Sequence, residues 1–110
     1  MIDYNEDDIR EDREHELTQL PEKYGLSIEE LRERYQHPIA YSEVMHPAFM
    51  LTETVEHYFA NSPSVLFDEE AYRHAHNAGT ALFNLYQRLG QLRSEMQDAE
   101  ENNTTESKTE

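Results

Sequence analysis

A long repeat of apolar residues in the second half of the chain constrains the fold more than any other feature. Between Asp68 and Gln97 the apolar side chains recur at alternating steps of four and three residues. The repeat consists of Ala71, Ala75, Ala78, Leu82, Leu85, Leu89, Leu92 and Met96. Its 3.5-residue period predicts a helix that buries one face. Tyr72, Phe83 and Tyr86 lie beside the repeat, so we expect a broad packed face rather than a thin two-stranded seam.

The start of this helix is marked by local signals. Asp68 is a suitable N-cap, and Glu69 and Glu70 would lie in the first turn, where the helix dipole favours negative charge. Phe67 precedes the cap and is predicted to act as a hydrophobic staple. We therefore expect the helix to begin directly after Asp68.

A second helix is predicted from about Pro47 to Asn61. Proline is favoured at the first helical position, and the segment ends at Asn61-Ser62-Pro63. One face would carry Ala48, Leu51, Val55, Tyr58 and Phe59. The short connection to the long helix predicts an antiparallel helical hairpin. Ile39 to Met45, bracketed by Pro38 and Pro47, either extends the preceding helix or forms a separate turn.

The segment from Leu17 to Gln36 is predicted to form two short helices around a turn at Gly25. Ser27 and Glu30 have the spacing of a capping box at the start of the second of these helices. The arrangement faintly resembles a helix-turn-helix, but a helix that reads DNA is expected to be basic, and Pro21 falls inside the first helix. We interpret the segment as a structural helical turn.

These elements predict an all-α protein, a small helical bundle of three or four helices built on the antiparallel hairpin. Residues 1–16 would be an acidic N-terminal arm or a solvated helix, and residues 17–97 the helical domain. Residues 98–110 have no apolar side chain beyond Ala99, so we expect a disordered acidic C-terminal tail.

The two hairpin helices differ in predicted length, about 45 Å against about 22 Å at 1.5 Å per residue. Half of the long helix would then lack a partner within the hairpin. Either the segment 17–36 covers it, or a second copy of the chain does so. A homodimer would use Leu85, Leu89, Leu92 and Met96.

Charge and composition narrow the classes of partner. The 110-residue chain carries 24 acidic and 9 basic side chains, a net charge of -15. Residues 1–16 contribute -6 and residues 98–110 contribute -4. Such a balance disfavours direct binding of nucleic acid or anionic lipid. The chain has no cysteine, no signal-like N-terminus and no apolar run long enough to span a bilayer, so we predict a cytoplasmic protein.

Candidate metal and catalytic groups are sparse. Glu43 and His46 have the spacing of one Glu-x-x-His element, whereas a di-iron site needs two such elements. The i, i+4 pairs Glu53–His57 and Glu70–His74 are typical of helix surfaces. We therefore predict no metal, no cofactor and no enzymatic activity.

Arg32 and His37 have a different spacing, Arg-x4-His. It resembles the motif of HEPN-type ribonucleases, small helical proteins in which these two side chains act on the RNA phosphodiester. Pro38 follows the histidine directly, and the net charge opposes the approach of RNA. The resemblance keeps a helical ribonuclease open as an alternative to a protein without catalysis.

The remaining chemistry is that of an interaction surface. Dense carboxylates on a helical scaffold can dock onto a basic, nucleic-acid-binding protein by mimicking a nucleic acid, as an inhibitor or adaptor does. Phe49 and Met50 could add an apolar hot spot. A self-assembling structural protein is the alternative from another class. The predicted partner-binding residues are Asp7, Asp8, Glu11, Asp12, Glu29, Glu30, Glu33, Glu53, Glu56, Phe49 and Met50.

Overall fold

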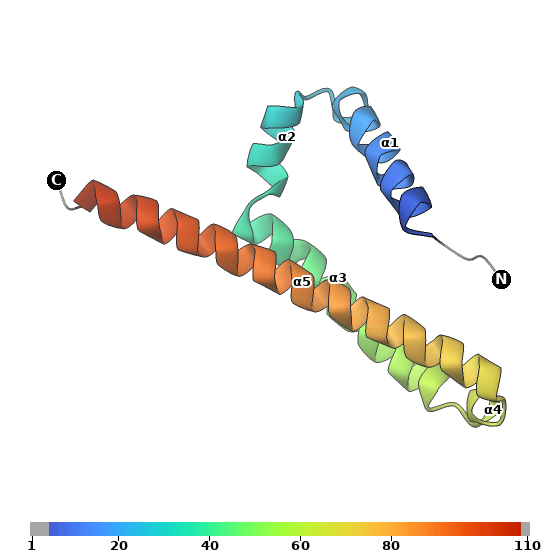
Figure 1. The fold of residues 1–110 in the computed structure, drawn as a ribbon. Helices are drawn as coiled ribbons and strands as arrows, with labels where there is room; N and C mark the ends of the chain where they lie inside the picture. Colours follow the sequence, from blue (N-terminus) through green and yellow to red (C-terminus); the bar gives the residue numbers. More distant parts are fainter. Residues whose placement is uncertain (1–4, 109–110) are drawn as a thin grey trace. The chain divides into compact units, whose positions relative to one another are not determined.

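The computed structural model describes residues 5–108, with side chains described as far as Glu100. Within this range every regular element is a helix, which confirms the all-α prediction (Figure 1). The elements are α1 (Glu6–Tyr24), α2 (Ile28–Tyr35), α3 (Pro38–Val55), the π-helical turn η1 (Glu56–Ala60), α4 (Pro63–Leu66) and α5 (Glu69–Lys108). The chain divides after Tyr35 into two compact units.

The first unit contains α1 and α2. The side chain of Asn5 caps α1 by accepting the backbone N–H of Asp8 at 2.8 Å. The helix ends at Gly25, whose φ of 67° is the left-handed conformation that favours glycine. Of the two predictions for the N-terminal segment, an acidic arm or a solvated helix, residues 6–16 form the helix. This helix continues without a break through Pro21 to Tyr24.

The turn that follows contains the predicted capping box. Glu30 N–H donates to Ser27 Oγ at 3.2 Å, and Ser27 N–H donates to Glu30 Oε1 at 3.3 Å. Both hydrogen bonds satisfy backbone donors that the first turn of a helix leaves without an intrahelical partner. The capping box and the turn at Gly25 are therefore confirmed.

The second unit is a hairpin in which α3 and η1 run antiparallel to α5 (Figure 1). Contacts that lie progressively later in α3 meet progressively earlier residues of α5, which is the signature of antiparallel packing. The contacting pairs are His37 with Glu100, Ser42 with Arg93, Met45 with Gly90, Phe49 with Tyr86, and Val55 with Gly79. The predicted hairpin is therefore present.

The prediction that this helix begins at Pro47 is wrong, because α3 begins at Pro38 and carries Pro47 in its interior. His37 is the N-cap, and its ring Nδ1 accepts the backbone N–H of Ile39 at 3.2 Å. An interior proline removes one helical hydrogen bond. Burial of Met45 and Ala48 on either side of Pro47 holds the helix together across that loss.

The longer α3 changes what covers α5. Together α3 and η1 span residues 38–60, about 34 Å at 1.5 Å per residue. The region of α5 from Leu85 to Met96 lies alongside the first half of α3, so the premise that half of the long helix lacks a partner is wrong. The predicted disordered tail is not confirmed, since α5 continues to Lys108; residues 109–110 lie outside the described residues.

The core of the hairpin is thin. Met45 and Ala48 are 7% and 3% exposed, and Pro38 is also buried. On α5 the positions that face α3 include Gly79, Tyr86 and Arg93. Each of these follows a residue of the predicted repeat by one, so the repeat is rotated by part of a turn from the packed face. Two helices form only two layers, which leaves much apolar surface uncovered.

The predicted start of α5 is half right. Ala71 N–H donates to Asp68 Oδ2 at 2.8 Å, so Asp68 is the N-cap. Phe67 is 90% exposed and does not act as a staple. The short helix α4 occupies the connection just before it.

Candidate partner-binding groove

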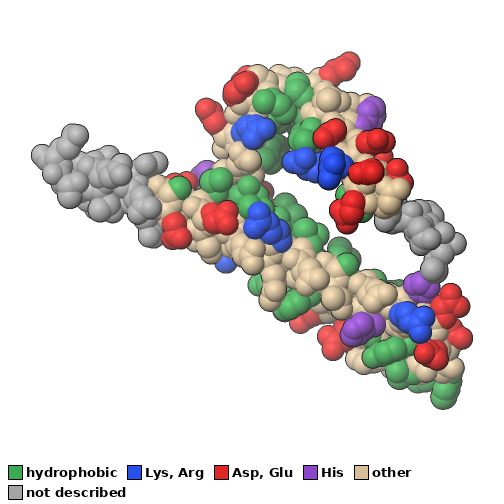
Figure 2. Space-filling model, in the orientation of Figure 1, with side chains coloured by type: hydrophobic (Ala, Val, Ile, Leu, Met, Phe, Trp, Pro, Cys, Tyr) green, Lys and Arg blue, Asp and Glu red, His purple; other side chains and the backbone are tan. Residues whose placement is uncertain are grey.

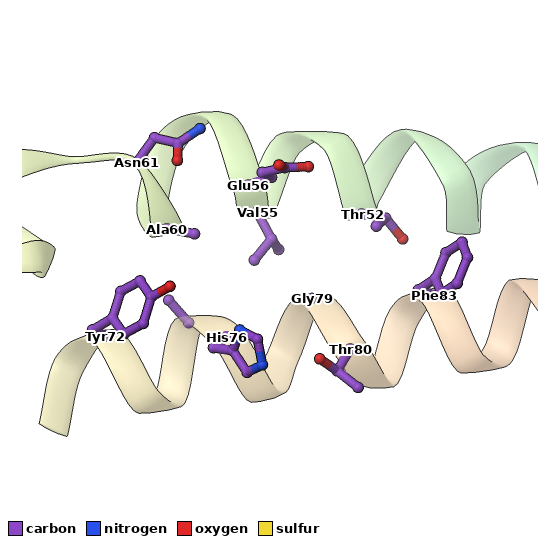
Figure 3. Close-up of a pocket in the computed structure, with 11 residues that line it drawn as sticks. Thr52, Val55, Glu56, Ala60, Asn61, Tyr72, His76, Gly79, Thr80 and Phe83 are labelled. Carbon is purple, nitrogen blue, oxygen red and sulfur yellow. The ribbon is translucent and has the colours of Figure 1, made fainter. Parts of the chain in front are cut away.

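A groove of about 400 Å³ lies between the C-terminal part of α3, η1 and the first half of α5. Figure 3 shows Tyr72 and Phe83 at the two ends of the groove, with Val55 and Ala60 pointing across it from the opposite helix. Ala75 and Gly79 face the groove from α5. These small residues leave room that larger side chains would fill.

The groove coincides with a change in helix type. The backbone N–H of Asn61 donates to the carbonyl of Glu56 at 3.1 Å, five residues earlier, which is the pattern of a π-helix. A π-turn widens the helix and rotates the residues that follow it. Glu56, the first residue of this turn, lies at the rim of the groove (Figure 3).

The lining of the groove combines one carboxylate with aromatic rings and contains no lysine or arginine. Glu56 supplies the negative charge, while Tyr72 and His76 lie with their rings 6.2 Å apart. The hydroxyl of Thr52 donates to the carbonyl of Ala48 at 2.8 Å and so is already paired. A carboxylate beside aromatic faces is suited to a cationic side chain with an apolar stem.

An aromatic row continues from the groove along the hairpin. Phe83 stacks on Tyr86 at 6.3 Å, and Tyr86 contacts Phe49 at 5.6 Å between ring centroids. Phe49 and Phe83 remain 42% and 44% exposed. Glu53 lies four residues after Phe49 and three before Glu56, a spacing that places these three side chains on one face of the helix.

The predicted partner-binding residues fall into two groups, one in each unit. In the second unit Glu56 lines the groove, and Phe49 and Glu53 share its helix face by their spacing. Met50, 48% exposed, lies next to Phe49 in the chain. The carboxylates of the first unit are all exposed: Asp7, Asp8, Glu11 and Asp12 on α1, and Glu29, Glu30 and Glu33 on α2. Glu30 also serves the capping box.

The four residues predicted to mediate self-association are not equivalent. Leu85 is 46% exposed, whereas Leu89, Leu92 and Met96 are half-buried. Their covering is explained by the first half of α3, which runs along this part of α5.

The candidate catalytic and metal residues have local partners. His37 caps α3, and its Nε2 lies 3.8 Å from Glu100 Oε1, while Arg32 is exposed in the first unit. His74 Nε2 lies 3.7 Å from Glu70 Oε1 on the surface of α5, as its i, i+4 spacing predicts. Among the side chains of residues 5–100 the structure holds no group of three histidines or carboxylates placed to share a metal ion.

Sequence reasoning missed the groove. The π-turn has no sequence signature, and Pro47 suggested a shorter helix than α3. One signal was present: Tyr72, His76, Thr80 and Phe83 follow one another at steps of four, four and three, so they share a flank of the predicted long helix.

Comparisons with protein families, with curated proteins and with solved structures yielded no match to this chain. No helix in the described part of the chain has the length and apolar character needed to cross a bilayer. The groove and its neighbouring carboxylates therefore have to be interpreted from their own chemistry.

Proposed function

We propose that this chain is a non-enzymatic protein-binding module, an acidic inhibitor or adaptor that docks on a basic surface of another protein. The observation that carries the proposal is the position of Glu56 at the rim of an aromatic groove whose lining contains no lysine or arginine, with Glu53 three residues before it on the same helix face. Lysine and arginine side chains on a partner would find both a counter-charge and an aromatic face there.

Charge and apolar contact have separate roles in this proposal. The carboxylates accelerate encounter with a positive surface and determine which partners are accepted. Phe49, Tyr72 and Phe83 supply apolar area that is removed from water in the complex, where a few aromatic side chains can contribute most of the affinity. A nucleic-acid-binding protein is the kind of partner whose basic surface matches dense carboxylates.

The first unit adds to the same attraction. Its described residues, 5–35, carry eleven acids against five bases, and the acids are exposed on α1 and α2. Exposed charges at this density act mainly on the association rate and are screened by salt. We therefore assign encounter to α1 and α2, and specific contact to the groove.

The test is affinity capture of partners from a cell lysate by the tagged full-length chain, at low and high salt and with competing DNA. We expect a basic, nucleic-acid-handling protein that is lost at high salt and displaced by DNA. The double variant Glu53→Lys with Glu56→Lys should abolish its capture. Glu95→Lys with Asp98→Lys is the matched control, since it makes the same change in net charge at exposed positions outside the groove. Equal loss in both variants would refute a specific role for the groove.

A further inference from the structure

The exposed polar side chains that line the groove have no partner of their own within the described part of the chain. They come from both sides of the groove: Glu56 and Asn61 at the two ends of η1, and Tyr72, His76 and Thr80 on α5 (Figure 3). None of these side chains makes a hydrogen bond or an ion pair with another described residue. Their acceptor atoms are therefore available to a group that enters the groove from outside.

The floor of the groove is apolar and less exposed than its rim. Val55, Ala60, Ala75 and Gly79 are half-buried, whereas the polar residues around them are exposed. A carboxylate beside apolar surface attracts a cation more strongly than one surrounded by water, because the effective dielectric constant is lower there. The methylene stem of a long cationic side chain can lie along such a floor. The groove thus offers a place for a positive charge and a place for its stem.

The size of the groove limits its occupant to one side chain. Its volume of about 400 Å³ is near the lower end of the range for ligand pockets, roughly 300 to 1,000 Å³. A helix with its side chains is about 10 to 12 Å across and does not fit into such a space. A partner would therefore insert a side chain and keep its backbone at the rim.

An arginine of the chain itself indicates which cation suits this environment. A neighbouring hollow shares Tyr72 and His76 with the groove and is completed by Glu69 and Arg73. There the guanidinium of Arg73 donates to Glu69 Oε1 at 3.2 Å. In Figure 2 carboxylate and histidine side chains gather around a basic side chain at this end of the hairpin. The groove has the same two rings and the carboxylate of Glu56, but its lining supplies no guanidinium.

We propose that the groove is a pocket for a single arginine side chain of the partner, and that it prefers arginine to lysine. This inference rests on the proposed function, since it names the side chain that the groove receives from a basic protein. A guanidinium is planar, carries five N–H donors in a fork and stacks on aromatic faces. Tyr72 and His76 supply two such faces, tilted by 32° to one another. The acceptors lie on both sides of the groove, which suits the several edges of a guanidinium better than the single nitrogen of an ammonium group.

The experiment is an NMR titration of the ¹⁵N-labelled full chain at a pH of about 7.5, where histidine is mostly neutral. The probes are three glycine–serine peptides whose central residue is arginine, lysine or citrulline, the uncharged counterpart of arginine. The arginine peptide should shift the backbone amide signals of Ala60, Asn61, Gly79 and Thr80, with a dissociation constant of about 1 mM. The lysine peptide should bind about fivefold more weakly, and the citrulline peptide should leave these signals unchanged.

Two pairs of variants locate the binding. Glu56→Gln should weaken binding of the arginine peptide about tenfold, because it removes the carboxylate at the rim. Glu43→Gln removes the same charge at an exposed position of α3 outside the groove and should leave the binding unchanged. Tyr72→Leu should lower the affinity for arginine to that for lysine, whereas Tyr58→Leu changes a tyrosine outside the groove lining and should keep the preference.

The outcomes separate this inference from the proposed function. Equal affinity for the arginine and lysine peptides, equal effects of the Glu56 and Glu43 variants, or no shift at about 20 mM of the arginine peptide would overturn the arginine pocket. Capture of a basic protein that depends on Glu53 and Glu56 would then still support the proposed function. Arginine-selective shifts in the groove, with no basic protein captured from the lysate, would support the pocket and count against that function.

Discussion

Replacing Gly79 with alanine should stabilise the hairpin by about 1 to 2 kcal/mol, from a gain of about 1 kcal/mol in helix propensity and up to about 0.8 for a buried methyl group. Gly79 lies inside α5, and its φ is not positive, so alanine can adopt its backbone conformation. A methyl group there would lie 3.7 Å from Val55 Cγ1, an ordinary van der Waals contact. Nothing in the hairpin has to move to accept it.

Gly90→Ala is the matched comparison. Its methyl group would lie 3.4 Å from Met45 Cε, at the limit of a comfortable contact, so the gain should be smaller than at Gly79. Urea and thermal unfolding, both followed by far-ultraviolet circular dichroism at one fixed protein concentration, measure the two variants. Gly79→Ala should raise the melting temperature by about 4 to 8 °C per kcal/mol for a unit of this size. Destabilisation by Gly79→Ala, or a larger gain from Gly90→Ala, would refute the reasoning.

Gly79→Ala should at the same time weaken partner capture, because the new methyl group fills the floor of the groove. Met45→Ala should cost about 2 to 5 kcal/mol and broaden the urea transition, because Met45 is among the few buried side chains and lies against Gly90. Pro47→Ala should raise the free energy of unfolding by about 1 to 3 kcal/mol, because it restores a backbone N–H inside α3 at an exposed position. Unchanged stability would show that the proline is already accommodated by a bend.

Local signals in the sequence were sufficient for helix type and for most helix ends. Asp68, Ser27 and Gly25 act through hydrogen bonds and dihedral angles that span three or four residues, so their roles can be read without knowing the fold. The apolar repeat from Ala71 to Met96 likewise predicts a long helix, because its period depends on the backbone geometry alone.

Tertiary contacts determined the rest. The sequence around Pro47 does not tell whether this proline begins a helix or lies inside one. The burial of Met45 and Ala48 on either side of it favours the interior position. Because α3 is therefore long, it covers the end of α5 that a helix beginning at Pro47 would leave to another segment or a second copy. The groove depends on a π-turn directly after Val55 and on Gly79, which faces Val55 from α5; the two segments are distant in sequence. Helix period and caps depend on interactions within a few residues of the chain. In contrast, the face that α5 turns toward α3, with Gly79, Tyr86 and Arg93, depends on which side chains meet across the hairpin.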